Sequence, residues 1–255
     1  MKTALTIAGS DPSGGAGIQR DLRTFRDFKV RGLSAVTALT AQNGKSVKAV
    51  EPVAPRILAR QVDVLLEEFD VDAVKLGMLA NPEVVAAVTR LIKRHGLKNV
   101  VLDPVFRASP GRGQSGRVGR PLLTPLRPGI TALKKLLPLV RVVTPNLDEA
   151  AVLSGIKVTG VKSMEEAAER IHGLGPACVL VTGGHLKGSP IDVLYDGKGF
   201  TRCEAPRIKG ADTHGTGCML SAAVAAKLAR GRGVKKAIKE AKRYVTLELR
   251  RRSKI

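Results

Sequence analysis

Short aliphatic runs alternate with amphipathic helical patterns along most of this 255-residue chain. The runs predict strands at Ala4–Ala8, Leu33–Ala38, Ala73–Leu76, Val100–Leu102, Val140–Val143 and Val179–Val181. The other patterns predict helices at Ile18–Phe28, Pro55–Glu68, Glu83–His95, Ile130–Leu136, Leu147–Leu153, Met164–Leu174, Gly217–Ala229 and Val234–Leu249. Aromatic residues make up only 3% of the chain, so the core must be aliphatic. This alternation predicts an α/β fold with a doubly wound, mostly parallel sheet flanked by helices on both faces.

Two segments depart from the alternation. Ile191–Tyr195 and Phe200–Ala205 flank the turn 196–199 and predict a small antiparallel hairpin. Segment 106–128 is rich in Gly, Pro and Arg and has no periodicity, which is typical of a basic lid or a flexible insertion. No linker is evident elsewhere, so we expect residues 1–255 to form a single domain.

Positive charge is unusually abundant. The chain has 43 Lys and Arg residues against 22 Asp and Glu residues, for a formal net charge of +21. Basic residues concentrate between Pro104 and Leu147 and again from Lys227 to Ile255. Such a field attracts nucleotides, phosphate esters or nucleic acids. A solvated basic face is the alternative interpretation.

Cysteine usage and the N-terminus indicate a cytoplasmic protein. Cys178, Cys203 and Cys218 form no CxxC pair and are odd in number, so we expect neither a disulfide framework nor a zinc site. The apolar run after Lys2 is too short for a signal peptide, and no apolar stretch of about 18 residues is present to span a membrane.

The segment from Asp212 to Cys218 reads Asp-Thr-His-Gly-Thr-Gly-Cys and precedes an Ala-rich helix. A Gly-rich turn at a helix start points backbone N–H groups at one spot, where the helix dipole also favours a phosphate. Cys218 falls in the first helical turn, which predicts a lowered thiol pKa and a base for phosphoryl transfer to an alcohol. A helix cap with a buried, inert Cys is the alternative.

This segment resembles the signature of the ribokinase-like superfamily, whose last position is usually Asp. With Cys there and His before the Gly, it is similar to the hydroxymethylpyrimidine and phosphomethylpyrimidine kinases of thiamine biosynthesis. Further blocks follow in that family's order: 4–19, 38–43, 75–79, 103–105, 144–150, 183–185 and 192–197. The resemblance implies a ribokinase-like fold and an ATP- and Mg²⁺-dependent kinase. Its substrates would be 4-amino-5-hydroxymethyl-2-methylpyrimidine and then the monophosphate, which becomes the diphosphate.

The resemblance places the pyrimidine among Ala16, Asp21, Gln42, Met78 and Val105. The chemistry agrees, because a flat aminopyrimidine fits between apolar side chains while an amide supplies a donor and an acceptor at the ring edge. A carboxylate at Asp21 can accept from an amino or hydroxyl group. Plain core packing is the alternative for Met78 and Val105.

The resemblance implies three more groups of residues: Cys218, Gly215 and Gly217 for catalysis, Asn146, Thr182, Gly184, His214 and Thr216 for the nucleotide, and Asp103 and Glu149 for Mg²⁺. Asp103 and Glu149 follow apolar strands, at the edge where open α/β sheets bind ligands. Glu149 could instead be a carboxylate that favours a helix start. Thr182 departs from the many relatives that have Lys there.

Two rival functions remain. A pyridoxal or pyridoxine kinase of the same fold would act on a similar flat heterocycle, although Gln42 favours the pyrimidine. A nucleic-acid-binding protein would use the charge of +21, but stacking aromatics are scarce and no recognised binding motif is present. We therefore expect an aminopyrimidine and ATP as partners and no membrane, and the resemblance adds a homodimer.

Two Gly-containing segments are misleading. Gly44-Lys45-Ser46 resembles the end of a P-loop, but position 39 is Leu where that motif needs Gly. The loop 9–17 does not satisfy GxGxxG, because position 20 is Arg. Neither a P-loop protein nor a Rossmann dehydrogenase is supported.

Overall fold

The described residues of the computed structural model, 1–44, 46–107, 121–124, 126–186 and 188–253, form one nine-stranded sheet. Its strands follow the order β3-β2-β1-β4-β5-β6-β7-β8-β9. The strands are β1 Thr3–Ser10, β2 Arg31–Gln42, β3 Val47–Pro52, β4 Ala73–Leu76, β5 Val100–Leu102, β6 Val142–Val143, β7 Val179–Val181, β8 Ile191–Tyr195 and β9 Phe200–Glu204. The helices are α1 Gly17–Asp27, α2 Pro55–Glu68, α3 Pro82–His95, α4 Leu126–Leu136, the 3₁₀ turn η1 Leu137–Leu139, α5 Leu147–Ser154, α6 Val161–His172, α7 Thr216–Ala229 and α8 Val234–Arg252.

The centre of the sheet is parallel and its edges are antiparallel. Strands β2, β1, β4, β5, β6 and β7 run parallel to their neighbours in that order. β3 pairs antiparallel with β2, and β8 and β9 continue antiparallel from β7. The prediction of a doubly wound, mostly parallel sheet with a small hairpin is therefore confirmed.

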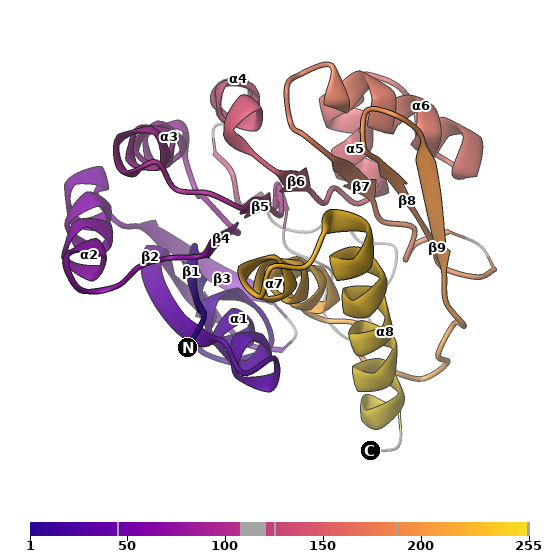
Figure 1. The fold of residues 1–255 in the computed structure, drawn as a ribbon, viewed down its shortest axis with the longest axis horizontal. Helices are drawn as coiled ribbons and strands as arrows, with labels where there is room; N and C mark the ends of the chain where they lie inside the picture. Colours follow the sequence, from indigo (N-terminus) through magenta and orange to yellow (C-terminus); the bar gives the residue numbers. More distant parts are fainter. Residues whose placement is uncertain (45, 108–120, 125, 187, 254–255) are drawn as a thin grey trace.

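Helices cover both faces of the sheet (Figure 1), with α2 to α6 over one face and α1, α7 and α8 over the other. The central strands supply aliphatic side chains to both faces in alternation. In β5, Val100 and Leu102 pack in the core beneath α2 to α6, while Val101 packs against the core beneath α1, α7 and α8. Strands that are buried on both faces need apolar residues at every position, which is why they appear as continuous aliphatic runs.

The edge of the sheet at β2 and β3 was only partly predicted. β2 extends from Arg31 to Gln42, well beyond the predicted Leu33–Ala38, and β3 was not predicted at all. Both have mixed burial, because they lie at an edge where one face is open to solvent. Their polar residues hide the period-two pattern on which the strand prediction rests.

Segment 106–128 is partly ordered at its ends. Phe106 and Leu122 are buried, and the backbone N–H of Leu122 donates to the carbonyl of Phe106 at 2.8 Å. Helix α4 begins at Leu126, so the last residues of the segment are helical rather than irregular. Residues 108–120 and Pro125 lie outside the described part of the chain, and the predicted basic lid remains a prediction.

The parallel strands place their carboxyl ends at one edge of the sheet, and α7 begins at the same edge. The strand order reverses between β1 and β4, the kind of point where open α/β sheets bind ligands. In the described residues, no helix is long and apolar enough to cross a membrane.

Candidate active site

A cleft lies at this carboxyl edge, between the ends of the central strands and the start of α7. It encloses about 950 Å³, part of which is open to solvent. The predicted site residues that line it are Ala16, Gln42, Met78, Asp103, Val105, Asn146, Glu149, His214, Gly215, Gly217 and Cys218. The fold therefore brings residues from both ends of the chain into one place.

Four predicted residues fall outside the described lining of the cleft: Asp21, Thr182, Gly184 and Thr216. Asp21 is fully buried behind that lining, so its placement does not support the predicted contact with a substrate. Thr182 follows β7, and its backbone N–H donates to the carbonyl of Pro145 at 2.8 Å. Gly184 is exposed beyond it, and Thr216 is the first residue of α7.

The glycine-rich N-terminal loop and the glycine-rich loop before α7 pack against each other at the N-terminus of α7. Gly215 caps the helix with φ of 73°, a left-handed conformation that favours glycine. A Cβ atom at Gly215 would lie 1.9 Å from the carbonyl oxygen of Gly15, so the two loops touch through backbone. The absence of side chains at these positions is what allows the N-terminal loop to close on the start of α7.

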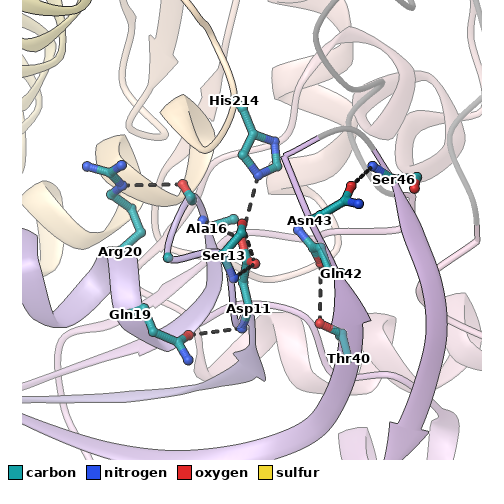
Figure 2. A network of polar contacts seen from close by, with 12 residues as sticks. Asp11, Ser13, Ala16, Gln19, Arg20, Thr40, Gln42, Asn43, Ser46 and His214 are labelled. Carbon is teal, nitrogen blue, oxygen red and sulfur yellow. Dashed lines mark hydrogen bonds and ion pairs between the residues drawn. The ribbon is translucent and has the colours of Figure 1, made fainter.

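Asp11 organises the N-terminal loop (Figure 2). One carboxylate oxygen accepts from the N–H and the hydroxyl of Ser13 at 2.9 and 2.7 Å, and the other accepts from the N–H of Ala16 at 2.8 Å. The imidazole of His214 lies 3.6 Å from the same carboxylate. Burial raises the pKa of Asp11, but the neighbouring His214 and the hydrogen bonds outweigh it and lower the pKa to about 2. Asp11 is therefore an anion that links the two glycine-rich loops.

Lys75 and Asp21 form a buried ion pair beneath the cleft. The ammonium of Lys75 lies 2.8 Å from a carboxylate oxygen of Asp21, and both side chains are fully buried. The hydroxyl of Thr6 donates to the same oxygen at 2.6 Å. Burial alone would lower the pKa of Lys75, but the charges of Asp21 and Asp103 raise it, so the lysine stays protonated. This places a fixed positive charge at the floor of the cleft.

Asp103 and Glu149 are two buried carboxyl groups in the same cleft. Burial raises the pKa of Asp103, against the opposing effect of Lys75. Burial, followed by the charge of Asp103, raises the pKa of Glu149 well above its usual value. Glu149 also completes a capping box with Asn146, in which each side chain accepts from the other's backbone N–H at 2.9 Å. Glu149 therefore does make the helix-start contact that was the alternative interpretation, and it also lines the cleft.

The prediction of a lowered thiol pKa at Cys218 is wrong. Burial raises the pKa of Cys218 to about 12, and the nearby carboxyl groups of Asp103 and Asp21 add to this rise. The ammonium of Lys75 acts in the opposite direction without reversing it. Desolvation disfavours a thiolate and here outweighs the stabilisation that a helix start provides. Without ligands, Cys218 is therefore a neutral thiol.

Comparison with known proteins identifies the family. Residues 11–255 match the family model described as phosphomethylpyrimidine kinase. The chain is 39% identical to the hydroxymethylpyrimidine/phosphomethylpyrimidine kinase of Aquifex aeolicus, over 99% of this chain and 96% of that protein. The chain belongs to the phosphomethylpyrimidine kinase family.

Solved structures of vitamin kinases share the fold of this family member. The crystal structure of a phosphomethylpyrimidine kinase from Clostridium difficile has a TM-score of 0.82 and 37% identity, covering 97% of this chain and 99% of that one. An ADP complex of Bacillus subtilis pyridoxal kinase has a TM-score of 0.84 and 41% identity, covering 96% and 90%. The resemblance inferred from the sequence blocks is confirmed, and so is the ribokinase-like fold class.

Two residues of this phosphomethylpyrimidine kinase family site were not predicted: Asp11 and Lys75. A signal for Lys75 was present, because Lys is rarely buried unless it is paired, and it interrupts an otherwise aliphatic strand. For Asp11, the sequence Asp-Pro-Ser-Gly-Gly is typical of a turn in which the Asp side chain accepts from nearby N–H groups. The partners Asp21 and His214 are distant in sequence, so neither contact could be derived from local pattern.

Replacing Gly215 by Ala should abolish most activity of this family member. The new methyl group would overlap the carbonyl of Gly15 and would also meet an unfavourable φ of 73°. The N-terminal loop must then move, and a displacement of about 1 Å in a catalytic constellation can cost roughly 100-fold in rate. The measurement is kcat/KM with the pyrimidine substrate, alongside the melting temperature.

The matched control is Gly199→Ala, because a Cβ atom there meets nothing within 4 Å. Its kcat/KM should equal that of the wild type. Wild-type activity in Gly215→Ala would show that the contact between the two loops is dispensable.

Proposed function

We propose that this protein is an ATP-dependent kinase of thiamine biosynthesis. It would phosphorylate the hydroxymethyl group of 4-amino-5-hydroxymethyl-2-methylpyrimidine and then convert the monophosphate to the diphosphate. The observation that carries this proposal is one cleft that holds both the glycine-rich start of α7 and the pair Met78 and Val105 beside Gln42. Membership of the phosphomethylpyrimidine kinase family supports the same substrate class.

The substrate end of the cleft suits a flat heterocycle. Met78 and Val105 contribute apolar surface and belong to one hydrophobic cluster with Ala38 and Leu122. A Cβ atom at Gly9 would lie 2.3 Å from the Met78 Cε atom, so the glycine makes room for that side chain. Gln42 lines the cleft beside Thr40, whose hydroxyl lies 3.4 Å from the Gln42 amide oxygen (Figure 2) and donates to the carbonyl of Ser10 at 2.8 Å. The Gln42 amide would then read the polar edge of the pyrimidine.

The nucleotide would lie toward the helix start, with its phosphates against α7. Asn146 and His214 line the cleft there, and Thr182, Gly184 and Thr216 would contact the nucleotide from beyond that lining. A pyridoxal kinase solved with ADP shares the fold, which supports a nucleotide substrate. The sheet runs without interruption from β3 to β9, which supports one kinase domain over residues 1–255.

The donor set fits Mg²⁺. In the described residues, no group of three or more His, Cys, Asp or Glu side chains is placed to hold a metal ion. Burial disfavours the charged forms of both Asp103 and Glu149, and the charge of Asp103 further disfavours that of Glu149, so a cation would relieve both effects. Mg²⁺ typically binds through one or two carboxylates with waters and substrate phosphates. When bound, it would neutralise charge on the phosphate oxygens.

Catalysis by the protein's own residues would rest on position and charge. Backbone N–H groups at Gly215 and Gly217 would hold the transferred phosphoryl group, and the Lys75 ammonium would add positive potential from below. Water is displaced by the apolar side chains around the acceptor, which strengthens each of these interactions. Cys218 lies where it can take the proton of the acceptor hydroxyl, but only after the thiol itself has ionised.

The first test offers purified protein ATP and Mg²⁺ with hydroxymethylpyrimidine, its monophosphate or pyridoxal. We expect ATP consumption with both pyrimidines and slow turnover of pyridoxal, because Gln42 complements the pyrimidine edge. Similarity to a pyridoxal kinase at 41% identity makes pyridoxal phosphorylation the second candidate function. Activity on pyridoxal alone would replace the proposed substrate by that one.

Replacing Cys218 by Ala should slow the first phosphorylation more than the second. Only the alcohol must lose a proton, because a phosphate monoester has a second pKa of about 6 and is already largely ionised at neutral pH. We expect a loss of roughly 100-fold or more in kcat for the alcohol, as is usual when a general base is removed. The thiolate fraction grows until the pH passes the Cys218 pKa of about 12, so wild-type kcat for the alcohol should still rise above pH 9.

The control for this variant is Cys178→Ala, since Cys178 is buried in the core beneath α1, α7 and α8 and is not among the described residues that line the cleft. Cys178→Ala should carry out both phosphorylation reactions at wild-type rates. An equal loss of both reactions in Cys218→Ala, or a flat alkaline pH profile for the alcohol, would rule out proton transfer to Cys218.

A further inference from the structure

The last turn of α8 reaches the glycine-rich loop at the start of α7. One guanidinium nitrogen of Arg252, Nη1, donates to the carbonyl of His214 at 2.9 Å and to the carbonyl of Asp212 at 3.1 Å. These residues lie 38 and 40 positions away in the sequence. α8 packs alongside α7 in the same hydrophobic core (Figure 1), so the helix carries Arg252 to the outer side of the loop.

The two bonds determine which way the loop's N–H groups point. A trans peptide unit is planar, and its C=O and N–H groups point in opposite directions. The carbonyls held by Arg252 belong to the same peptide units as the N–H groups of Thr213 and Gly215. Those N–H groups therefore face away from Arg252, and Gly215 lines the cleft. In the part of the chain that the structure describes, the Gly215 N–H has no protein acceptor.

We propose that Arg252 is a positioning residue, which holds the backbone of the loop 212–215 so that the Gly215 N–H faces the phosphoryl group. The proposal rests on the proposed kinase function, because it assigns the loop a phosphate ligand. Arg252 is not among the described residues that line the cleft, so it would act through the backbone of the loop.

Charge supports this role. Burial lowers the pKa of Arg252, and the nearby cation of Arg20 lowers it further, so keeping a guanidinium here is costly. Arg20 itself donates from Nε to the carbonyl of Gly15 at 3.3 Å, on the facing loop. The Gly15 carbonyl also contacts Gly215, so both cations bind backbone carbonyls where the two loops meet. The guanidinium of Arg252 polarises the peptide unit shared by His214 and Gly215, which favours an anion at the Gly215 N–H.

A purely structural role for Arg252 would be to fasten the end of α8. Replacing it would then lower stability and leave the rate of the folded enzyme unchanged. A positioning role predicts instead weaker phosphate binding and slower turnover in a protein that is still folded. Stability, phosphate binding and turnover can all be measured in the same variants.

The experiment compares Arg252→Ala with Arg251→Ala. Arg251 has the same charge in the same helical turn, is 78% exposed and pairs only with Glu248 at the surface. For each protein, calorimetry gives the Kd of the ATP analogue AMP-PNP, and steady-state assays give kcat/KM. We expect Arg252→Ala to weaken AMP-PNP binding about 10-fold and to lower kcat/KM by 10- to 100-fold. Arg251→Ala should match the wild type in both.

Chemical rescue sharpens the test. Guanidinium ions added to Arg252→Ala should restore part of kcat/KM, because they can occupy the vacated position, and they should not help Arg251→Ala. If Arg252→Ala does not fold, Arg252→Lys replaces it: one ammonium cannot reproduce the planar guanidinium contacts, so an intermediate loss of AMP-PNP affinity is expected.

Two results would overturn the proposal: AMP-PNP affinity within twofold of the wild type in folded Arg252→Ala, or wild-type affinity in Arg252→Lys. AMP-PNP binding can be measured without a pyrimidine, so it tests the role of Arg252 separately from the proposed kinase function. A wild type that binds AMP-PNP but phosphorylates no pyrimidine would contradict the proposed function and leave the role of Arg252 measurable.

Discussion

The ammonium of Lys75 and the carboxylate of Asp21 lie 2.8 Å apart at the base of the cleft, without solvent contact. Removing two ions from water costs several kcal/mol each, so either side chain alone would be strongly unfavourable there. The pair ties α1 to β4, and Thr6 of β1 donates to the same carboxylate. The strands, the first helix and the charge in the cleft are therefore fixed by one interaction.

The rest of the site is arranged around that charge. Asp103 lies close enough for its charge to raise the pKa of Lys75, and Asp103 in turn raises the pKa of Glu149. These pKa values depend on the distances between the charged groups. The close-packed helices on both faces of the sheet keep those distances fixed. Backbone contact between the loops at Gly15 and Gly215 then closes the N-terminal loop against the start of α7.

The sequence predicted the sheet because its strands depend on local pattern, whereas most residues that the structure brings to the cleft were implied by the family resemblance. Continuous aliphatic runs predicted the central strands, and the glycine-rich segment before α7 predicted a phosphate site. Edge strand β3 was missed because its residues are half exposed, and α4 begins earlier than predicted because Gly and Pro obscure its start. The predicted lowering of the Cys218 pKa was wrong because burial and neighbouring carboxyl groups outweigh the helix dipole. Both of these effects depend on tertiary contacts, which local sequence does not show. The ion pair of Asp21 with Lys75 was not predicted, because the two residues lie 54 positions apart in the sequence.

The most direct test of the central claim compares Lys75→Met with the double variant Lys75→Met/Asp21→Leu. The single change leaves the buried Asp21 carboxylate without its partner and should lower the free energy of unfolding by about 3–5 kcal/mol. The double change replaces the pair by apolar groups and should recover most of that lost stability. Because the positive charge is absent from both, kcat/KM with the pyrimidine should stay low in both. A double variant that regains stability together with wild-type kcat/KM would show that the pair serves the fold alone and not the chemistry of the cleft.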